Sequence, residues 1–182
     1  MNKYIDFMIF IMSMFIISCN SSRNVTSYKK TNRTKSHHNS VSTNSSYRSS
    51  HTNDSSKESK SLLRIAKSFI GVPYKYGGNN SSGFDCSGLV MVSFDGLGLK
   101  LPRNSAQQAE RGKEIKVSDV KEGDLIFFNT SGSSISHVGI VESIDNSGQI
   151  KFIHSSTTKG VIISSLEENY WKARFVKAVR LL

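Results

Sequence analysis

Three residues in the C-terminal part of the sequence have the types and order that a nucleophile and its base require. Cys86 comes first, His137 lies 51 residues later, and His154 lies 17 residues after that. A cysteine attacks as a thiolate, an imidazole can take the thiol proton, and a third group can hold that imidazole in place. We therefore predict Cys86 as the nucleophile, His137 as the base and His154 as the residue that orients the base.

The stretch FDCSGLV, residues 84–90, sets the surroundings of the thiol. It is typical of the start of a helix, and a helix N-terminus lowers a thiol pKa, as does a nearby imidazolium. Asp85 opposes this effect if its carboxylate faces the sulfur, so we expect Asp85 to cap backbone N–H groups or to hold a substrate ammonium. The backbone N–H of Cys86 is placed to stabilise the oxyanion that forms during acyl transfer.

Other interpretations of these residues stay open from their types alone. A lone buried cysteine is usually inert packing, and a histidine at a strand end is usually a hydrogen-bonded structural residue. Cys86 and the two histidines could also hold a metal ion, although their spacing matches no usual ligand pattern. The sequence has no GxGxxG, no phosphate loop and no zinc pair of cysteines, so we expect neither a metal nor a cofactor.

The N-terminus has the pattern of an export signal. Residues 7–17 are apolar apart from Ser13, and this run is too short to span a bilayer. It ends in Ser18 and Cys19, which resembles a bacterial lipobox and predicts a signal peptide over 1–18 with a lipid on Cys19; an ordinary cleaved signal that contains a cysteine is the alternative. Asn20 favours an outer membrane where the organism has two. A lipidated Cys19 leaves Cys86 as a reactive thiol or a partner in an intermolecular bridge.

A polar segment separates this signal from the rest of the chain. Ser, Thr and Asn fill 24 of the 41 positions in 20–60, where Leu, Ile, Phe and Trp are absent. We predict a disordered, basic tether over 19–60, with a root-mean-square span of roughly 35 Å. Its net charge is +6, against +4 for residues 61–182. Such a tether favours an anionic membrane, and no recognition motif points to nucleic acid.

The remaining sequence, 61–182, is predicted to form one folded domain. Apolar residues recur at helical spacing first, and short β-rich runs follow, which favours the α+β class, with an antiparallel sheet backed by helices on one side. We predict a loop over 72–83 and a helix stop at Gly112. The predicted helices cover 61–71, 86–98 and a short segment capped by Asn104, and the predicted strands cover 124–129, 137–144, 149–156, 160–166 and 174–182.

Taken together, the motifs resemble the NlpC-type family of bacterial cell-wall cysteine peptidases. The match rests on DCSGLV, SHVGIV and FIHSS, supported by PYKYGG, LPRNSAQQ and GDLIFF, and it covers 61–182 in order. The resemblance implies a papain-like fold and the three catalytic roles given above. It also implies that the Tyr74 hydroxyl lies near the sulfur, and that Asp85 and Ser87 line the substrate groove.

The same resemblance implies the substrate. Family members of this type cut the stem peptides of peptidoglycan between γ-D-glutamate and the diamino acid, usually meso-diaminopimelate, through a thioester. We therefore expect a monomeric hydrolase, anchored to a membrane of the cell envelope through Cys19. Two alternatives stand beside it: a binding or scaffold lipoprotein with a decayed site, and an amidase or acyltransferase on the same fold.

Overall fold

The computed structural model describes residues 47–182, with side chains described from Asp54 onward. The predicted signal peptide, Cys19 and most of the predicted tether lie outside the described residues. The helical part of the described chain comes first and consists of α1 (Tyr47–Lys67), α2 (Cys86–Asp95) and α3 (Ser105–Gln108). Two short strands, β1 (Asn79–Asn80) and β2 (Gly83–Phe84), pair with each other between α1 and α2.

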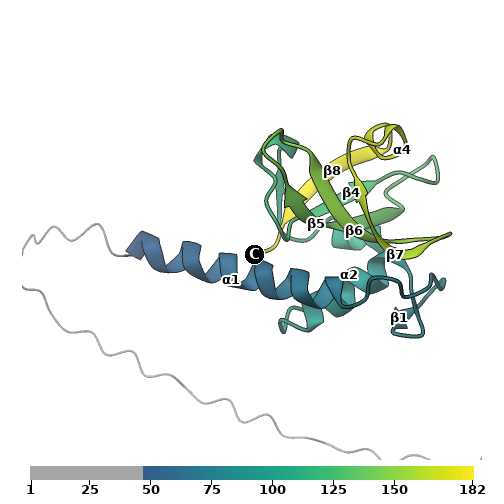
Figure 1. The fold of residues 1–182 in the computed structure, drawn as a ribbon, viewed down its shortest axis with the longest axis horizontal. Helices are drawn as coiled ribbons and strands as arrows, with labels where there is room; N and C mark the ends of the chain where they lie inside the picture. The colour runs from purple at the N-terminus through teal and green to yellow at the C-terminus, as the bar shows by residue number, and fades with distance from the viewer. Residues whose placement is uncertain (1–46) are drawn as a thin grey trace, which may run out of the picture. The chain divides into compact units, whose positions relative to one another are not determined.

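The rest of the domain is a six-stranded antiparallel sheet in the order β3-β8-β4-β5-β6-β7. Figure 1 shows α1 and α2 on one side of the sheet and α4 on the opposite side. This arrangement confirms the predicted α+β class. The strands are β3 (Lys113–Ile115), β4 (Leu125–Phe128), β5 (His137–Ile144), β6 (Ile150–Ser156), β7 (Gly160–Ser165) and β8 (Phe175–Arg180), and the short helices η1 (Val117–Asp119) and α4 (Asn169–Lys172) lie in the connections.

Helix α1 starts at Tyr47, inside the segment predicted as a disordered tether, so the helix begins earlier than the predicted 61–71. Leu62 and Ala66 are fully buried and fix the C-terminal half of the helix in the core. Once a helix is nucleated, each further residue that is fixed adds one hydrogen bond, whereas the first turn fixes several residues for one bond. The extension also has a packing partner, because a Cβ added at Gly123 would lie 2.9 Å from Ser59 Oγ.

In the part of the chain that the structure describes, no helix combines the length and the apolar character that a membrane span requires.

Helix α2 carries the predicted nucleophile at its first residue and packs between α1 and the sheet. Leu89, Val90 and Phe94 are fully buried, which holds the helix rigidly. Gly88 lies so close to the preceding loop that an added Cβ would come within 2.1 Å of the Gly78 carbonyl oxygen. The glycine after Cys86 therefore allows the loop at Gly78 to pack directly on the first turn of the helix.

The sheet is buried on both faces, although the sequence predicted helices on one side only. Leu125 and Phe127 of β4 belong to a cluster that includes side chains of α1 and α2. Ile126 and Phe128, which point the other way, belong to a second cluster with Trp171 of α4. Four consecutive apolar residues in β4 are thus explained by a core on each face.

Candidate active site

The thiol of Cys86 lies where the start of α2 meets the start of β5. Asp85 caps α2 in an extended conformation, and Cys86 is the first helical residue. The sulfur is 3.9 Å from the carbonyl oxygen of Ser136, and the backbone N–H of Val138 also points to it. The residues that contact the sulfur thus flank His137 on both sides in sequence.

The two histidines are joined to each other by a buried hydrogen bond. His137 Nε2 lies 3.0 Å from His154 Nδ1. The β5–β6 register, with Ile140 opposite Ile153, would place Gly139 opposite His154, so no side chain stands between the two imidazoles. Cys86, His137 and His154, far apart in the sequence, therefore meet at one end of the sheet. Among the described residues, Nδ1 of His137 makes no hydrogen bond, which leaves it available to the thiol.

A further hydroxyl continues this chain of contacts. His154 Nε2 lies 3.1 Å from Ser164 Oγ, and the serine is buried like both histidines. Sequence reasoning missed Ser164 because it lies in an ordinary β-rich run, and only the strand register of the folded sheet brings it to the imidazole.

Burial keeps both histidines neutral. It lowers the pKa of His137 to about 4, and burial together with the neighbouring His137 lowers the pKa of His154 to about 3. A neutral imidazole at physiological pH is able to accept a proton. His137 therefore has the protonation state that a general base needs.

The thiol is also neutral at rest, which corrects the expectation of a lowered thiol pKa. Burial raises the pKa of Cys86, and the nearby Asp85 carboxylate raises it further. These effects outweigh the backbone N–H groups of Val138, Ser87 and Cys86, which favour the thiolate. The site at neutral pH is thus a thiol beside an imidazole rather than a thiolate beside an imidazolium.

Aromatic rings enclose the histidine pair on the face of the sheet that α4 covers. The ring of Trp171 stacks on His137 with centroids 5.1 Å apart, and it meets His154 edge-on at 4.7 Å. The stacked indole fixes the plane of the base and can stabilise it through a cation–π contact when it carries a proton. Trp171 is the only tryptophan in the chain, and that was the one signal by which the sequence could have identified it.

The carboxylate of Asp85 is fully used by groups of the protein. It accepts hydrogen bonds from the backbone N–H groups of Gly88 at 2.7 Å and Gly77 at 3.0 Å. Arg103 donates to both of its oxygens, at 2.9 and 2.7 Å. Burial raises the pKa of Asp85, but Arg103 and the backbone donors outweigh it and hold the pKa below its usual range. This geometry favours the helix-cap role over a direct contact with a substrate ammonium.

Arg103 was missed as a site residue, although it lies within the LPRNSAQQ motif. Its bidentate contact with Asp85 requires the segment before α3 to fold back onto the start of α2. The predicted cap Asn104 places the arginine, since its side chain accepts a hydrogen bond from the backbone N–H of Gln107 at 2.8 Å. Ser87 is buried in this network, 3.3 Å from Asp85 Oδ1, and so lies beneath the site rather than on an open groove.

Tyr74 lies on the loop before α2 and is partly buried. An isolated parallel β-bridge between Tyr74 and Phe84 holds the loop beside the start of α2. Burial raises the pKa of the Tyr74 hydroxyl, and the charges of Cys86 and Asp85 raise it further. The charges at the start of α2 therefore act on this hydroxyl, and its place beside the sulfur stays a prediction.

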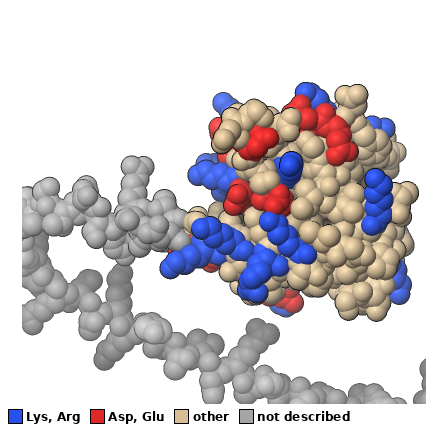
Figure 2. Space-filling model, in the orientation of Figure 1, with Lys and Arg blue, Asp and Glu red and all other residues tan. Residues whose placement is uncertain are grey.

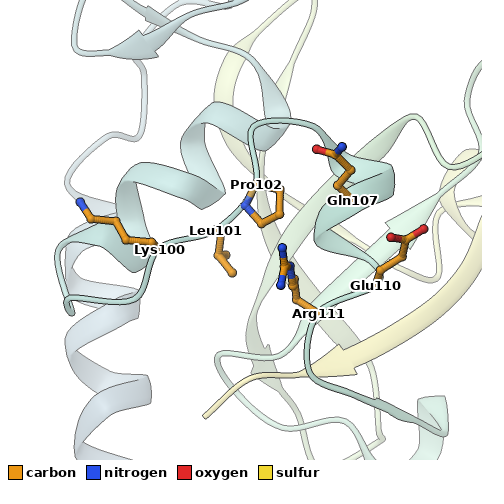
Figure 3. Close-up of a pocket in the computed structure, with 6 residues that line it drawn as sticks. All are labelled: Lys100, Leu101, Pro102, Gln107, Glu110 and Arg111. Carbon is orange, nitrogen blue, oxygen red and sulfur yellow. The ribbon is translucent and has the colours of Figure 1, made fainter. Parts of the chain in front are cut away.

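Two hollows of the surface help to locate the substrate. A groove of about 400 Å³ adjoins both histidines and is lined by hydroxyl side chains of the β6–β7 turn together with Lys159, Glu168 and Trp171. A larger hollow of about 630 Å³ lies at α3, and Figure 3 shows its six lining residues, none of which is a candidate for catalysis.

Within residues 54–182, no three potential metal ligands cluster. The two histidines are hydrogen-bonded to each other.

Comparisons with known proteins point to one family. The sequence model of the NlpC/P60 family matches residues 71–180. Murein DD-endopeptidase MepS/Murein LD-carboxypeptidase of Escherichia coli strain K12 is 45% identical over 113 residues, which are 62% of this chain and 57% of that protein. Gamma-DL-glutamyl hydrolase of Bacillus subtilis strain 168 is 42% identical over 116 residues, 62% of this chain and 27% of that protein.

Solved structures share the fold. An NlpC/P60 family protein from Bacillus cereus superposes with a TM-score of 0.61 at 30% identity, over 67% of this chain and 39% of that one. This likeness confirms the predicted papain-like arrangement of helices and sheet. The match thus spans little more than half of the E. coli protein and less than half of the two Bacillus proteins.

Proposed function

Because the chain belongs to the NlpC/P60 family, we propose that it is a cysteine peptidase that hydrolyses the stem peptides of peptidoglycan. The observation that carries this proposal is the position of the Cys86 sulfur, against the backbone on both sides of His137, whose ring is tied to His154. The intact set of three residues argues against a binding protein with a decayed site.

The proposed reaction is an acyl transfer in two halves. The sulfur of Cys86 attacks the amide carbonyl while its proton passes to His137 Nδ1, and the Cys86 backbone N–H stabilises the oxyanion. His137 then gives the proton to the leaving amine, and a thioester remains. Water attacks the thioester with His137 as base, which releases the carboxylic acid and restores the thiol.

The neutral resting state fits a proton transfer that accompanies the attack. The raised pKa of Cys86 and the lowered pKa of His137 keep the proton on sulfur until the substrate arrives. The imidazolium that forms then has two stabilising neighbours, the hydrogen-bonded His154 and the stacked ring of Trp171. A neutral orienting histidine stabilises this cation less than a carboxylate does. The stacked Trp171 ring adds to the stabilisation of the His137 imidazolium.

For the bond that is cut, we propose the link between γ-D-glutamate and the diamino acid. The name of the B. subtilis relative, a gamma-DL-glutamyl hydrolase, supports this bond. The name of the E. coli relative, a DD-endopeptidase, supports a second candidate, a bond between two D-centres. The groove of about 400 Å³ beside the histidines is open to solvent and does not distinguish the two bonds.

Digestion of defined muropeptides by the purified full-length chain tests the function, with products identified by mass spectrometry. A γ-D-glutamyl cut releases fragments that begin with the diamino acid, whereas a DD cut converts cross-linked dimers into monomers. We expect Cys86→Ala to abolish cleavage and to keep the wild-type melting temperature. Cleavage by Cys86→Ala at the wild-type rate, or no cleavage by the wild type, would contradict the proposal.

We also propose that a lipid on Cys19 anchors the domain to a membrane of the envelope. Figure 2 shows Lys and Arg side chains gathered on the surface over α1. Exposed basic residues of this helix recur at helical spacing, at Lys57, Lys60 and Arg64, and would favour an anionic bilayer, whereas Lys67 is paired with Glu142. Cys19→Ser should move the protein from the membrane fraction to the soluble fraction; a variant that stays with the membrane would show that the anchor lies elsewhere.

A further inference from the structure

We propose that Ser164 is a positioning residue for the reaction, because its hydroxyl can accept the Nε2–H of His154 and so stabilise the tautomer in which His137 Nδ1 is free to take the thiol proton. This inference deepens the proposed function and rests on it. The side chains form one continuous series of contacts, from His137 to His154 at 3.0 Å and from His154 to Ser164 at 3.1 Å.

The place of Ser164 is set by the backbone rather than by a flexible loop. It is the last residue but one of β7 and pairs with Phe152 of β6, while His154 pairs with Ile162. Ser164 and His154 are therefore diagonal neighbours on one face of the sheet, where side chains lie within reach of each other. His154 is almost fully buried, and Ser164 lines the groove beside it.

The hydrogen positions follow from the task of the base. To accept the thiol proton at Nδ1, His137 must carry its own hydrogen on Nε2, where it donates to His154 Nδ1. His154 must then carry its hydrogen on Nε2, and that N–H needs an acceptor. Ser164 Oγ is the atom in that position.

The reverse direction of the same chain would be inactive. If Ser164 donated to His154 Nε2, the hydrogen of His154 would move to Nδ1 and that of His137 to its own Nδ1. His137 would then present a donor to the sulfur and could not take its proton. In the active direction Ser164 accepts the hydrogen bond, and its removal takes this acceptor away from the His154 Nε2–H.

A neighbouring serine provides a matched control. Ser155 is also fully buried, and its hydroxyl donates to the Phe84 carbonyl oxygen at 2.7 Å. That bond involves neither histidine. Loss of the Ser155 hydroxyl therefore reports the structural effect of removing a buried hydrogen bond in the same strands, without an effect on the tautomers.

The test compares full-length wild type with Ser164→Ala, Ser164→Thr and Ser155→Ala. We expect Ser164→Ala to lower kcat about tenfold with little change in KM. Loss of the acceptor for His154 Nε2–H disfavours the tautomer of His137 that can take the thiol proton. Ser164→Thr, which keeps the hydroxyl, should restore most of the rate. Ser155→Ala should keep kcat, measured per folded enzyme. A kcat in Ser164→Ala equal to that of wild type, or an equal loss in Ser155→Ala, would overturn the proposal.

Nitrogen NMR of ¹⁵N-histidine-labelled protein tests the tautomers without turnover. We expect the hydrogen on Nε2 of both His137 and His154 in the wild type, and a changed His154 signal in Ser164→Ala but not in Ser155→Ala. Hydrogens on Nδ1 in the wild type would refute the role of Ser164. A protein that cleaves no muropeptide but shows the expected tautomers would contradict the proposed function alone.

Discussion

On one side of Cys86, an ion pair between Asp85 and Arg103 holds the start of α2, whereas on the other side two neutral histidines hold each other beneath aromatic rings. Both sides are built from polar groups that are paired, but their charge differs. The carboxylate and guanidinium keep their charges, since each shifts the pKa of the other towards its ionised form. Burial removes the charge from the imidazoles.

The difference separates the groups that stay in place from the group that transfers a proton. Asp85 and Arg103 together close the first turn of α2 onto the loop at Gly78, because Arg103 also donates to the Gly78 carbonyl at 3.3 Å. Fixed charges suit this task, which involves no proton. On the histidine side, a proton must arrive and leave within one reaction, and a neutral, desolvated base is ready to accept it.

Substitutions of the two histidines should have the largest effect on the reaction rate. His137→Ala removes the proposed base, and we expect kcat for a muropeptide to fall by about 10³-fold or more. His154→Ala leaves the base but not its orientation, so we expect a loss of about 10- to 100-fold. Both rates are measured at saturating substrate, per folded enzyme. Equal and mild losses in the two variants would remove His137 as the base.

Loss of the Asp85–Arg103 ion pair should lower the stability of the domain rather than change the chemical step. Arg103→Met leaves the buried carboxylate of Asp85 without its cation, and we expect unfolding free energy to fall by about 2 kcal/mol, less than for a fully buried pair because Arg103 is partly exposed. Urea denaturation measures this loss. Lys100→Met is the control, since its pair with Asp95 is exposed and should contribute almost nothing. A similar loss in both variants would contradict a structural role for the Arg103 pair.

Local patterns in the sequence predicted most of the elements around the site. The strand predicted over 137–144 is β5, and Asp85 and Asn104 cap α2 and α3 as expected. Caps and strand periodicity depend on neighbours in sequence, which is why they can be read without a structure. The residues that join distant segments were harder: the contacts of Arg103, Ser164 and Trp171 depend on how the sheet and loops pack.

The pKa of the thiol could not be predicted from position alone. A cysteine at a helix start suggested a lowered pKa, but in the structure burial and Asp85 raise it. Burial is a property of the whole domain, and its effect outweighed the local one. The α1 boundary was missed for a similar reason, because the polar residues before position 61 become helical by extending a helix whose apolar residues lie further along the chain.

The central claim is that thiol and imidazole are both neutral at rest, and the pH dependence of Cys86 alkylation tests it most directly. Iodoacetamide reacts with the thiolate, so its rate reports the ionised fraction of Cys86. We predict a slow rate at neutral pH that is still rising beyond about pH 8.5, the pKa of a free thiol, with no plateau at lower pH. A high rate that is constant between about pH 5 and 8 and is lost in His137→Ala would show a preformed thiolate–imidazolium pair, and would contradict the account.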